Sequence, residues 1–401
     1  MKKFLWFIVV AIAVVSFGLT IYYFSADNEV IYVRSSYLVV EEGEYISTSS
    51  LLEFKNRGKD TTLSFSSGNE DILSFQSEGN SFEAKKGGQS QIVVKTSNKR
   101  YSTFVIDVLV CDGSAEYPFV ITTEAALKKI GDTTIENNKY TADKNYRLGA
   151  DIALEEVESG NWTPIANFSG MFDGNFYTIS NVHITDQTVG ENTNSVGFFA
   201  YVSNSAVVKN LVLSNLKIEL TNGALVGSVA GASQGIIQTC LVNGSIKVDA
   251  YDSTSMIGGV VGIAERSTEA DSVMPKIDRC GFEGSISLPH DGSKNLTEYG
   301  GIVGRLGNAQ LSESYFRATG LGVQNYDNNF GGIAGGFVYG LTNGDARAYD
   351  NYAFFASENL ENVDYTKIAG LIAKNLETRQ DVVNKRVLGN YFGGNENLTQ
   401  A

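Results

Sequence analysis

Hydrophobic residues follow three different patterns along this 401-residue chain. The first 24 residues are almost entirely apolar after two lysines. Residues 31–110 alternate between apolar and polar positions in short runs bounded by turn residues, which is typical of strands with one buried face. Beyond residue 115, a short glycine-rich apolar motif recurs almost to the C-terminus. The patterns predict three domains, at residues 1–26, 29–112 and 115–401.

The N-terminal segment is long enough to cross a membrane as a helix. Its apolar run, Phe4–Phe24, has 21 residues, and at about 1.5 Å per residue it covers a hydrocarbon core of about 30 Å. Because Lys2 and Lys3 precede the run, the positive-inside rule places the following residues outside the cytoplasm. We therefore expect a single-pass signal anchor in the cell membrane, with the bulk of the chain extracytoplasmic at the cell surface. Cleavage near Ala26 as a signal peptide is the alternative and exports the chain equally.

Six short runs of alternating or β-branched residues occupy residues 31–110, and this density of strands predicts a β-sandwich. Three strings within it, Leu63–Phe75, Phe82–Val94 and Phe104–Val110, resemble the group 2 bacterial immunoglobulin-like domain. That family combines a Ser-Ser-Asn-x-x-hydrophobic strand, a Gly-x-hydrophobic-x-Ala-x-x-x-Gly turn and a closing strand of alternating valines. The resemblance implies an immunoglobulin-like spacer or adhesive module on a bacterial surface, without chemistry of its own.

The third domain repeats one apolar core, of which Ile257–Gly262 and Tyr299–Gly304 are two copies. The equivalent position in the seven cores is Gly170, Gly197, Ser228, Gly259, Gly301, Gly332 and Gly370. The spacings of 27, 31, 31, 42, 31 and 38 residues indicate one unit with loop insertions. Because a unit of two or three strands cannot bury its own apolar face, successive units must stack. The repeat therefore predicts an all-β solenoid, a right-handed parallel β-helix.

The paired glycines of the cores have two predicted roles. Glycine adopts positive φ angles without strain, so it suits the corner of a coil. It also lacks a side chain, so it fits where backbones approach closely, and the strands of stacked coils lie about 4.8 Å apart.

The cores resemble GLUG motifs, which are named for a Gly-Leu-x-Gly sequence. Tyr146–Leu154, Trp162–Ala166 and Phe168–Ile184 follow the order that opens many bacterial β-helix surface proteins. A short helix at Glu124–Ile130 is expected to cap the first coil, whose strand edges are otherwise unpaired. Ser228 departs from the motif. GLUG repeats occur in adhesin-like proteins and in non-catalytic parts of secreted proteases, so the resemblance implies a scaffold.

Composition and charge narrow the choice of partners. The chain has 42 glycines against 4 prolines and 4 methionines, which suits many short strands. Its net charge of −14 argues against nucleic acid and anionic lipid surfaces, because like charges repel. Three cysteines without a Cys-x-x-Cys motif and two histidines, His183 and His290, give no basis for a metal site. We expect no cofactor, and membrane contact only through the N-terminal helix.

Two of the cysteines, Cys240 and Cys280, occupy equivalent places in neighbouring coils, each three residues after an isoleucine. An interior stack of small apolar side chains is the expected arrangement. A disulfide between the adjacent coils is the alternative.

Polysaccharide lyases and hydrolases also use β-helices, with carboxylates and basic residues clustered on one face of the coils. The candidates here are Asp173, Asp249, Asp252, Asp271 and Asp278, with Arg266 and Arg279. Most lie in predicted turns, where aspartate is favoured by local hydrogen bonding, so we expect no catalytic residue. The acidic loop at residues 265–271 lacks the Gly-Gly-x-Gly-x-Asp spacing of repetitive calcium sites, so a solvated surface is expected instead.

Aromatic residues are frequent in the later coils, and strand alternation should point about half of them inward. The loop aromatics Tyr326 and Tyr339 are therefore the expected ligand contacts. The sequence as a whole predicts a non-enzymatic, membrane-anchored cell-surface protein that adheres to, or binds, an unidentified surface protein or glycan. A polysaccharide-active lyase or hydrolase and a structural subunit of a surface assembly are the alternatives.

Overall fold

The computed structural model describes most of the chain from residue 29 onward. The described ranges are 29–56, 61–97, 103–190, 194–250, 255–268, 272–287, 298–321, 330–337, 339–340, 344–355, 372–375, 387–388, 390–394 and 399–400. The chain forms two compact units, residues 1–120 with 144–149, and residues 121–143 with 150–401. Among the described residues, no helix is long and apolar enough to cross a membrane, and the predicted anchor at residues 1–26 lies outside them.

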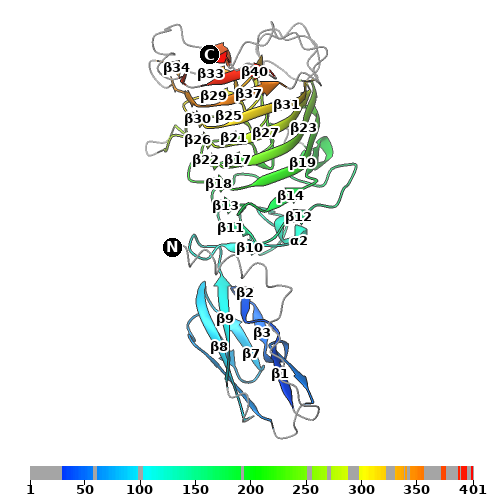
Figure 1. Cartoon of the computed structure of the whole chain (residues 1–401), viewed down its shortest axis with the longest axis vertical. Coiled ribbons are helices and arrows are strands. Elements are labelled where there is room, and N and C mark those ends of the chain that lie inside the picture. The colour runs from blue at the N-terminus through cyan, green and yellow to red at the C-terminus, as the bar shows by residue number, and fades with distance from the viewer. Residues whose placement is uncertain are drawn as a thin grey trace. The chain divides into compact units, whose positions relative to one another are not determined.

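The first unit contains two β-sheets and a strand pair around one core (Figure 1). Its elements are β1 (Val30–Val33), β2 (Tyr37–Glu41), β3 (Tyr45–Ser47), η1 (Thr48–Ser50), β4 (Leu52–Lys55), β5 (Leu63–Ser67), β6 (Leu73–Gln76), β7 (Ser81–Ala84), β8 (Gly88–Thr96), β9 (Thr103–Cys111), β10 (Phe119–Ile121) and β11 (Tyr146–Leu148). The sheet orders are β2-β9-β8-β5 and β3-β7-β6, and β1 pairs with β4. Leu73, Phe82 and Ile106 are fully buried in the shared core. The unit is therefore a β-sandwich.

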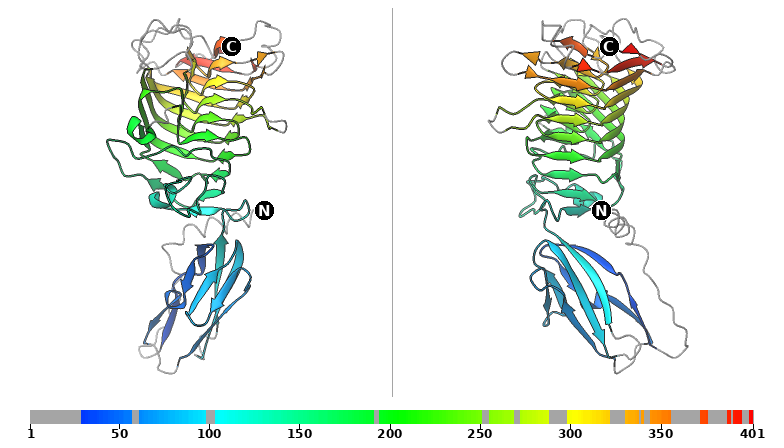
Figure 2. Two further views of the ribbon diagram at one scale, coloured as in Figure 1. Left: turned by 180° about the vertical axis from the view of Figure 1, so that it is seen from behind. Right: turned by 60° about the vertical axis from the view of Figure 1, so that its left-hand side comes forward.

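The second unit is built from stacked coils, and the five central coils each contribute a strand to four sheets in turn (Figure 2). Sheet I contains β16 (Ser195–Val196), β20 (Leu225–Gly227), β24 (Met256–Gly258), β28 (Glu298–Gly300) and β32 (Phe330–Gly331). Sheet II contains β17 (Phe199–Val202), β21 (Ala230–Ser233), β25 (Val261–Ala264), β29 (Val303–Leu306), β33 (Ala334–Phe337) and β38 (Ile372–Asn375).

The other two sheets follow in the same coil order. Within the second unit, sheet III contains β13 (Met171–Asp173), β18 (Val207–Lys209), β22 (Ile236–Gln238), β26 (Lys276–Asp278), β30 (Gln310–Ser312), β36 (Arg347–Tyr349) and β39 (Val387–Leu388). Sheet IV contains β12 (Ile152–Ala153), β14 (Thr178–Ser180), β19 (Val212–Asn222), β23 (Leu241–Ala250), β27 (Gly281–Ser287), β31 (Tyr315–Leu321), β37 (Tyr352–Phe355) and β40 (Tyr391–Gly394). β15 (His183–Thr185) joins it through β19, and β41 (Thr399–Gln400) pairs antiparallel with β40.

Every strand pair between successive described coils is parallel, so the predicted parallel β-helix is confirmed. Within sheet IV, for example, Val242 lies beside Phe282 and Phe282 lies beside Phe316, all facing the interior. The predicted loop insertions are also found. Eleven residues separate β25 from β26, whereas two separate β21 from β22 in the preceding coil.

Short helices accompany the first coils. α2 (Glu124–Leu127) is shorter than the predicted Glu124–Ile130, and its N-cap Thr123 accepts a hydrogen bond from the Ala126 amide. Its Leu127 side chain is buried. α3 (Asp186–Val189) follows β15 and begins with a capping box between Thr185 and Thr188.

The glycines of the cores serve close packing. A Cβ on Gly262 of sheet II would lie 2.6 Å from the Val226 amide nitrogen and 2.9 Å from the Met256 carbonyl oxygen, both in sheet I. A Cβ on Gly304 would meet the Ile257 nitrogen at 2.5 Å. Real Cβ atoms do not approach backbone this closely, so sheets I and II are in direct backbone contact along a narrow arch.

The other predicted role of these glycines is wrong. The core glycines among the described residues do not have positive φ angles. The positive φ falls instead on the residue after each of five successive sheet III strands, β18, β22, β26, β30 and β36, namely Asn210, Thr239, Arg279, Glu313 and Asp350, at 48° to 55°. A single left-handed residue is tolerated with modest strain, and Asn and Asp tolerate it best. The corner of the coil is therefore turned without glycine.

The residue after each corner points into the solenoid and forms a buried column. Its members are Leu211, Cys240, Cys280, Ser314, Asn351 and Asn390. The Cys280 amide donates to Ser314 Oγ at 3.0 Å, the Ser314 amide to Asn351 Oδ1 at 2.9 Å, and the Asn351 amide to Asn390 Oδ1 at 3.0 Å. Each polar side chain thus satisfies a backbone N–H group of the preceding coil, because a buried donor without a partner is costly.

The two cysteines of this column are free thiols, stacked in the interior as predicted. Burial raises the pKa of Cys240 well above its ordinary value, and the hydrogen bond with Cys280 raises it further. In the first unit, burial is also the main cause that raises the pKa of the Cys111 thiol to about 12.

Replacing Gly262 by alanine should destabilise the coils by about 1–3 kcal/mol, because the new methyl group meets backbone atoms that cannot rotate away. Gly307→Ala is the matched control, since its Cβ would meet the flexible side chain of exposed Glu265 at 3.0 Å. Guanidinium unfolding followed by circular dichroism measures both. Equal unfolding midpoints for the two variants would contradict the backbone contact between sheets I and II.

The three thiols should not react with a thiol reagent at pH 8 in the folded chain, because only the thiolate is nucleophilic and burial disfavours it. Unfolding the chain without a reductant should expose three reactive thiols. Mass spectrometry after alkylation counts them. A count of one, with Cys240 and Cys280 unlabelled, would show that the stacked pair is a disulfide.

Candidate binding surface on sheet IV

The outer face of sheet IV carries a row of apolar positions on successive coils, one of which is a glycine. Strand pairing places the row's members side by side in the order Leu241, Gly281, Tyr315, Tyr352 and Tyr391. Leu241 is 38% exposed and Tyr352 is 37% exposed, although both lie in regular strands. Apolar side chains that reach solvent from neighbouring coils make this face the candidate binding surface.

A second row runs beside the first, two residues further along each strand. It consists of Asn243, Glu283, Arg317 and Phe354. Phe354 is 38% exposed. Arg317 Nη1 donates to Glu283 Oε1 at 2.7 Å across neighbouring coils. The two rows together are called the sheet IV platform below.

The side chains between these rows form the core, as strand alternation requires. Phe282, Phe316 and Ala353 are fully buried, and the rings of Phe282 and Phe316 stack with centroids 6.1 Å apart. The Tyr352 and Tyr391 rings stack outside, with centroids 5.2 Å apart and planes within 10° of parallel. The buried rings fix the strands that present the exposed ones.

Tyr315 occupies a recess in the platform. Its ring lies over Gly281 of the preceding coil, in the space that a side chain there would fill. Burial raises the pKa of the Tyr315 hydroxyl, and the nearby Glu283 carboxylate raises it further, whereas Arg317 lowers it. Tyr315 therefore stays a neutral phenol beside the Glu283–Arg317 ion pair. One ligand could contact both the apolar Tyr315 ring and these polar groups.

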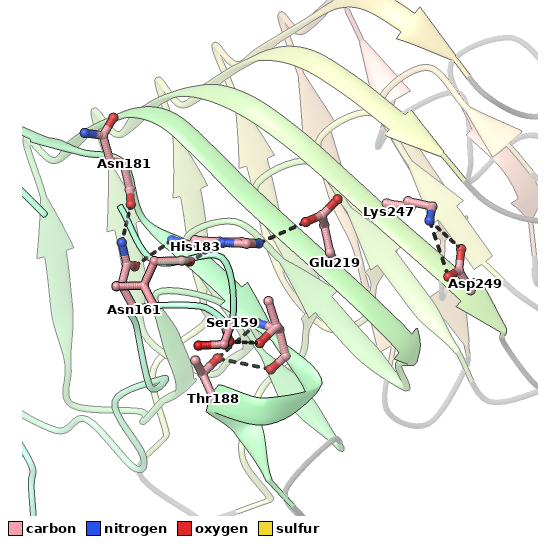
Figure 3. A network of polar contacts seen from close by, with 10 residues as sticks. Ser159, Asn161, Asn181, His183, Thr188, Glu219, Lys247 and Asp249 are labelled. Atoms are coloured by element: carbon pink, nitrogen blue, oxygen red, sulfur yellow. Dashed lines mark hydrogen bonds and ion pairs between the residues drawn. The ribbon is translucent and has the colours of Figure 1, made fainter. Parts of the chain in front are cut away.

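Below the platform, polar contacts join the first coils of sheet IV (Figure 3). His183 Nε2 lies 2.9 Å from Glu219 Oε2, and His183 Nδ1 lies 3.1 Å from the Val157 carbonyl oxygen. The Asn161 side chain accepts from the His183 amide and donates to the Asn181 carbonyl. Both imidazole nitrogens are occupied and the side chain is 15% exposed, so the network holds a loop against the coils.

The carboxylates proposed for an enzyme that the structure describes, Asp173, Asp249 and Asp278, lie on different coils. Asp173 and Asp278 lie in one column of sheet III, three coils apart, which is about 14 Å at about 4.8 Å per step. Paired glycosidase carboxylates stand about 5–10 Å apart. Asp173 pairs with Lys209 and accepts a hydrogen bond from Asn210, while Asp278 pairs with Arg279 and accepts one from Ser312. Both therefore stabilise the corners of coils.

The remaining candidates for an enzyme site are Asp249, Asp252, Asp271 and Arg266. Asp249 lies on sheet IV and pairs with Lys247 at 3.1 Å. Asp252 and Asp271 lie outside the described residues. Arg266 donates to the Ser272 carbonyl and hydroxyl within the predicted acidic loop. Within the described ranges, no three His, Cys, Asp or Glu side chains gather as metal ligands.

One buried carboxylate was not anticipated. Glu298 at the end of sheet I is 1% exposed and accepts two hydrogen bonds from Arg305 of sheet II, at 2.5 and 2.8 Å. A buried charge needs such a partner. The pair ties the two sheets together and leaves the carboxylate no free oxygen for chemistry.

The predicted ligand contacts fall outside the platform. Tyr326 lies outside the described residues, and Tyr339 lies in β34 (Tyr339–Gly340), which pairs with β35 (Gly344–Asp345), without a described side chain. The exposed strand aromatics Tyr352 and Phe354 are not among the predicted ligand contacts, because the prediction favoured aromatic residues in loops over those in strands. Their alternation with Ala353 was the available signal, since alternate residues of a strand face opposite sides.

The described fold is that of an all-β protein with a parallel β-helix.

The chain is similar to known proteins over parts of its length. No protein-family model matches the chain. It is 29% identical to halomucin of Haloquadratum walsbyi over 197 residues, which are 46% of this chain and 2% of halomucin. The chain therefore spans a very small part of that relative.

Two solved structures are similar over most of the chain. One is described as an IgA1 protease, with 14% identity, a TM-score of 0.41, and coverage of 80% of this chain and 25% of that chain. The other is a candidate immunoglobulin A1 protease from Bacteroides ovatus, with 15% identity, a TM-score of 0.39, and coverage of 73% and 81%.

Proposed function

We propose that the chain is a non-enzymatic, membrane-anchored cell-surface protein that binds a protein or glycan partner through the sheet IV platform. The observation that carries the proposal is the row of apolar positions on the outer face of a regular sheet, in which Leu241 and Tyr352 are exposed, Tyr315 and Tyr391 are half-buried, and the Tyr315 ring lies over Gly281. The exposed parts of these side chains remain in contact with water in the folded chain. A partner that covers them gains their burial.

The cell-surface assignment rests on the sequence of residues 1–26, with lysines before an apolar run and acidic residues after it. The resemblance to GLUG repeats and to a group 2 bacterial immunoglobulin-like module supports it, as does the partial similarity to halomucin. In this proposal, residues 29–112 act as an immunoglobulin-like spacer and residues 115–401 present the binding surface.

The alternative of a polysaccharide-active lyase or hydrolase is less well supported. Asp173, Asp249 and Asp278 each have a basic partner, and Asp173 and Asp278 lie about 14 Å apart along sheet III, farther than paired glycosidase carboxylates. The alternative of a structural subunit in a surface assembly uses the same platform as its docking face. This alternative differs from the proposed function only in its partner, which would be another component of the assembly.

Photo-crosslinking on intact cells tests the proposal. p-Benzoylphenylalanine in place of Tyr352 in the full chain should yield high-mass adducts on illumination, because the platform is covered by its partner. The matched control carries the same residue in place of Lys276, which is exposed on the outer face of sheet III. Absence of adducts at position 352, or equal yields at both positions, would contradict binding through sheet IV.

A further inference from the structure

We propose that the sheet IV platform binds an uncharged polysaccharide that runs along the solenoid axis, across successive coils. The inference rests on the proposed function and names the chemical class of the partner. Three properties of the platform support it: its charge balance, the close mixture of apolar and polar groups, and the periodic spacing of its rows.

The outer face of sheet IV is electrically balanced although the chain as a whole is acidic. The described strands of the sheet carry three basic and three acidic side chains, Lys217, Lys247, Arg317, Glu219, Asp249 and Glu283. The net charge of the chain is −14. A strongly charged partner would find no complementary field on a balanced surface. The affinity of a partner must therefore come from apolar contact and hydrogen bonds, which suits an uncharged ligand.

The mixture of groups matches a sugar ring better than a protein surface. The centre of a protein interface is depleted of charged residues, whereas the Glu283–Arg317 ion pair lies directly beside Tyr315. A pyranose ring has an apolar face of C–H groups and a rim of hydroxyl groups. Its apolar face can cover the Tyr315 ring, while Glu283 accepts hydrogen bonds from the hydroxyls and Arg317 donates them.

The spacing of the rows fits a polymer rather than a single sugar. Equivalent side chains recur at each coil, about 4.8 Å apart, and the Tyr352 and Tyr391 ring centroids are 5.2 Å apart. A linear chain laid along the axis meets Leu241, Tyr315 and Tyr352 in turn. Each contact is weak, but once one sugar unit is bound, the linked units have a high effective concentration at the neighbouring positions of the platform.

The position of the Tyr315 ring requires a glycine at residue 281. Any side chain at that position would collide with the Tyr315 ring, including its hydroxyl at 2.8 Å. Gly281→Ala therefore leaves every ligand-contacting group in the chain but lifts the Tyr315 ring from its recess. A hydrophobic patch of any shape would tolerate this change, whereas a flat sugar-binding surface would not.

The experiment uses the full chain in a detergent without a sugar head group, applied to an array of linear glucans, mannans, xylans and galactans, with polygalacturonate as the charged member. At least one uncharged glycan should bind. Calorimetry with the hexasaccharide of that glycan should give at least a tenfold weaker affinity for Tyr315→Ala, Tyr352→Ala and Gly281→Ala. Tyr315→Phe should stay within about threefold of the parent chain, because its ring is retained.

Tyr45→Ala is the matched control, since Tyr45 is 63% exposed in the first unit and should not affect the affinity. Unfolding midpoints equal to that of the parent chain show that the variants are folded. The inference is overturned if no uncharged glycan binds, if polygalacturonate binds more tightly, or if folded Tyr315→Ala keeps the parent affinity. Adducts at position 352 that proteases digest, without glycan binding, would overturn this inference and leave the proposed function standing. Absence of adducts at that position would overturn both.

Discussion

The structure of the coils depends on direct contact between the backbones of sheets I and II. Gly262 and Gly304 face backbone atoms of the opposite sheet at distances that leave no room for a side chain. Two sheets in such contact cannot enclose a core between them. The apolar interior must lie between this narrow arch and sheets III and IV, where the large buried rings Phe282 and Phe316 are found. The arch thus decides where the core lies and which face of sheet IV points to solvent.

Much of the fold could be predicted from the sequence, because each coil of a solenoid is encoded by a copy of the same sequence motif. Seven glycine-rich cores at nearly constant spacing predict stacked coils, and strand pairing from β13 to β40 bears this out. The 42-residue spacing correctly indicated insertions, which lie between strands. The reason for the glycines was only half predicted. Close approach of backbones explains them, while the left-handed corners use residues such as Thr239 and Arg279. Asn210 and Asp350 are of the types that favour a positive φ, whereas Thr239 and Arg279 are not, so the sequence does not predict the whole column of corners.

The candidate site was harder to predict. Aspartates in turns stand out in a sequence, yet Asp173 and Asp278 prove to stabilise corners. The platform depends on residues that are far apart in sequence, such as Leu241, Tyr315 and Tyr352, and become neighbours only once the register of the coils is known. Alternation within a strand gives the side to which a ring points. It does not predict which residues of the next coil lie beside the ring, because loop insertions change the number of residues between equivalent positions.

In the proposed function, a partner at the cell surface covers the outer face of sheet IV. Hydroxyl-radical footprinting of the full chain, with and without cell-envelope fragments, tests it most directly, because tyrosine oxidation reports exposure of each ring. Tyr352, which is 37% exposed, should be oxidised in the free chain and protected by the fragments, while exposed Tyr45 is oxidised equally in both. Unchanged oxidation of Tyr352, or equal protection of both tyrosines, would contradict the claim.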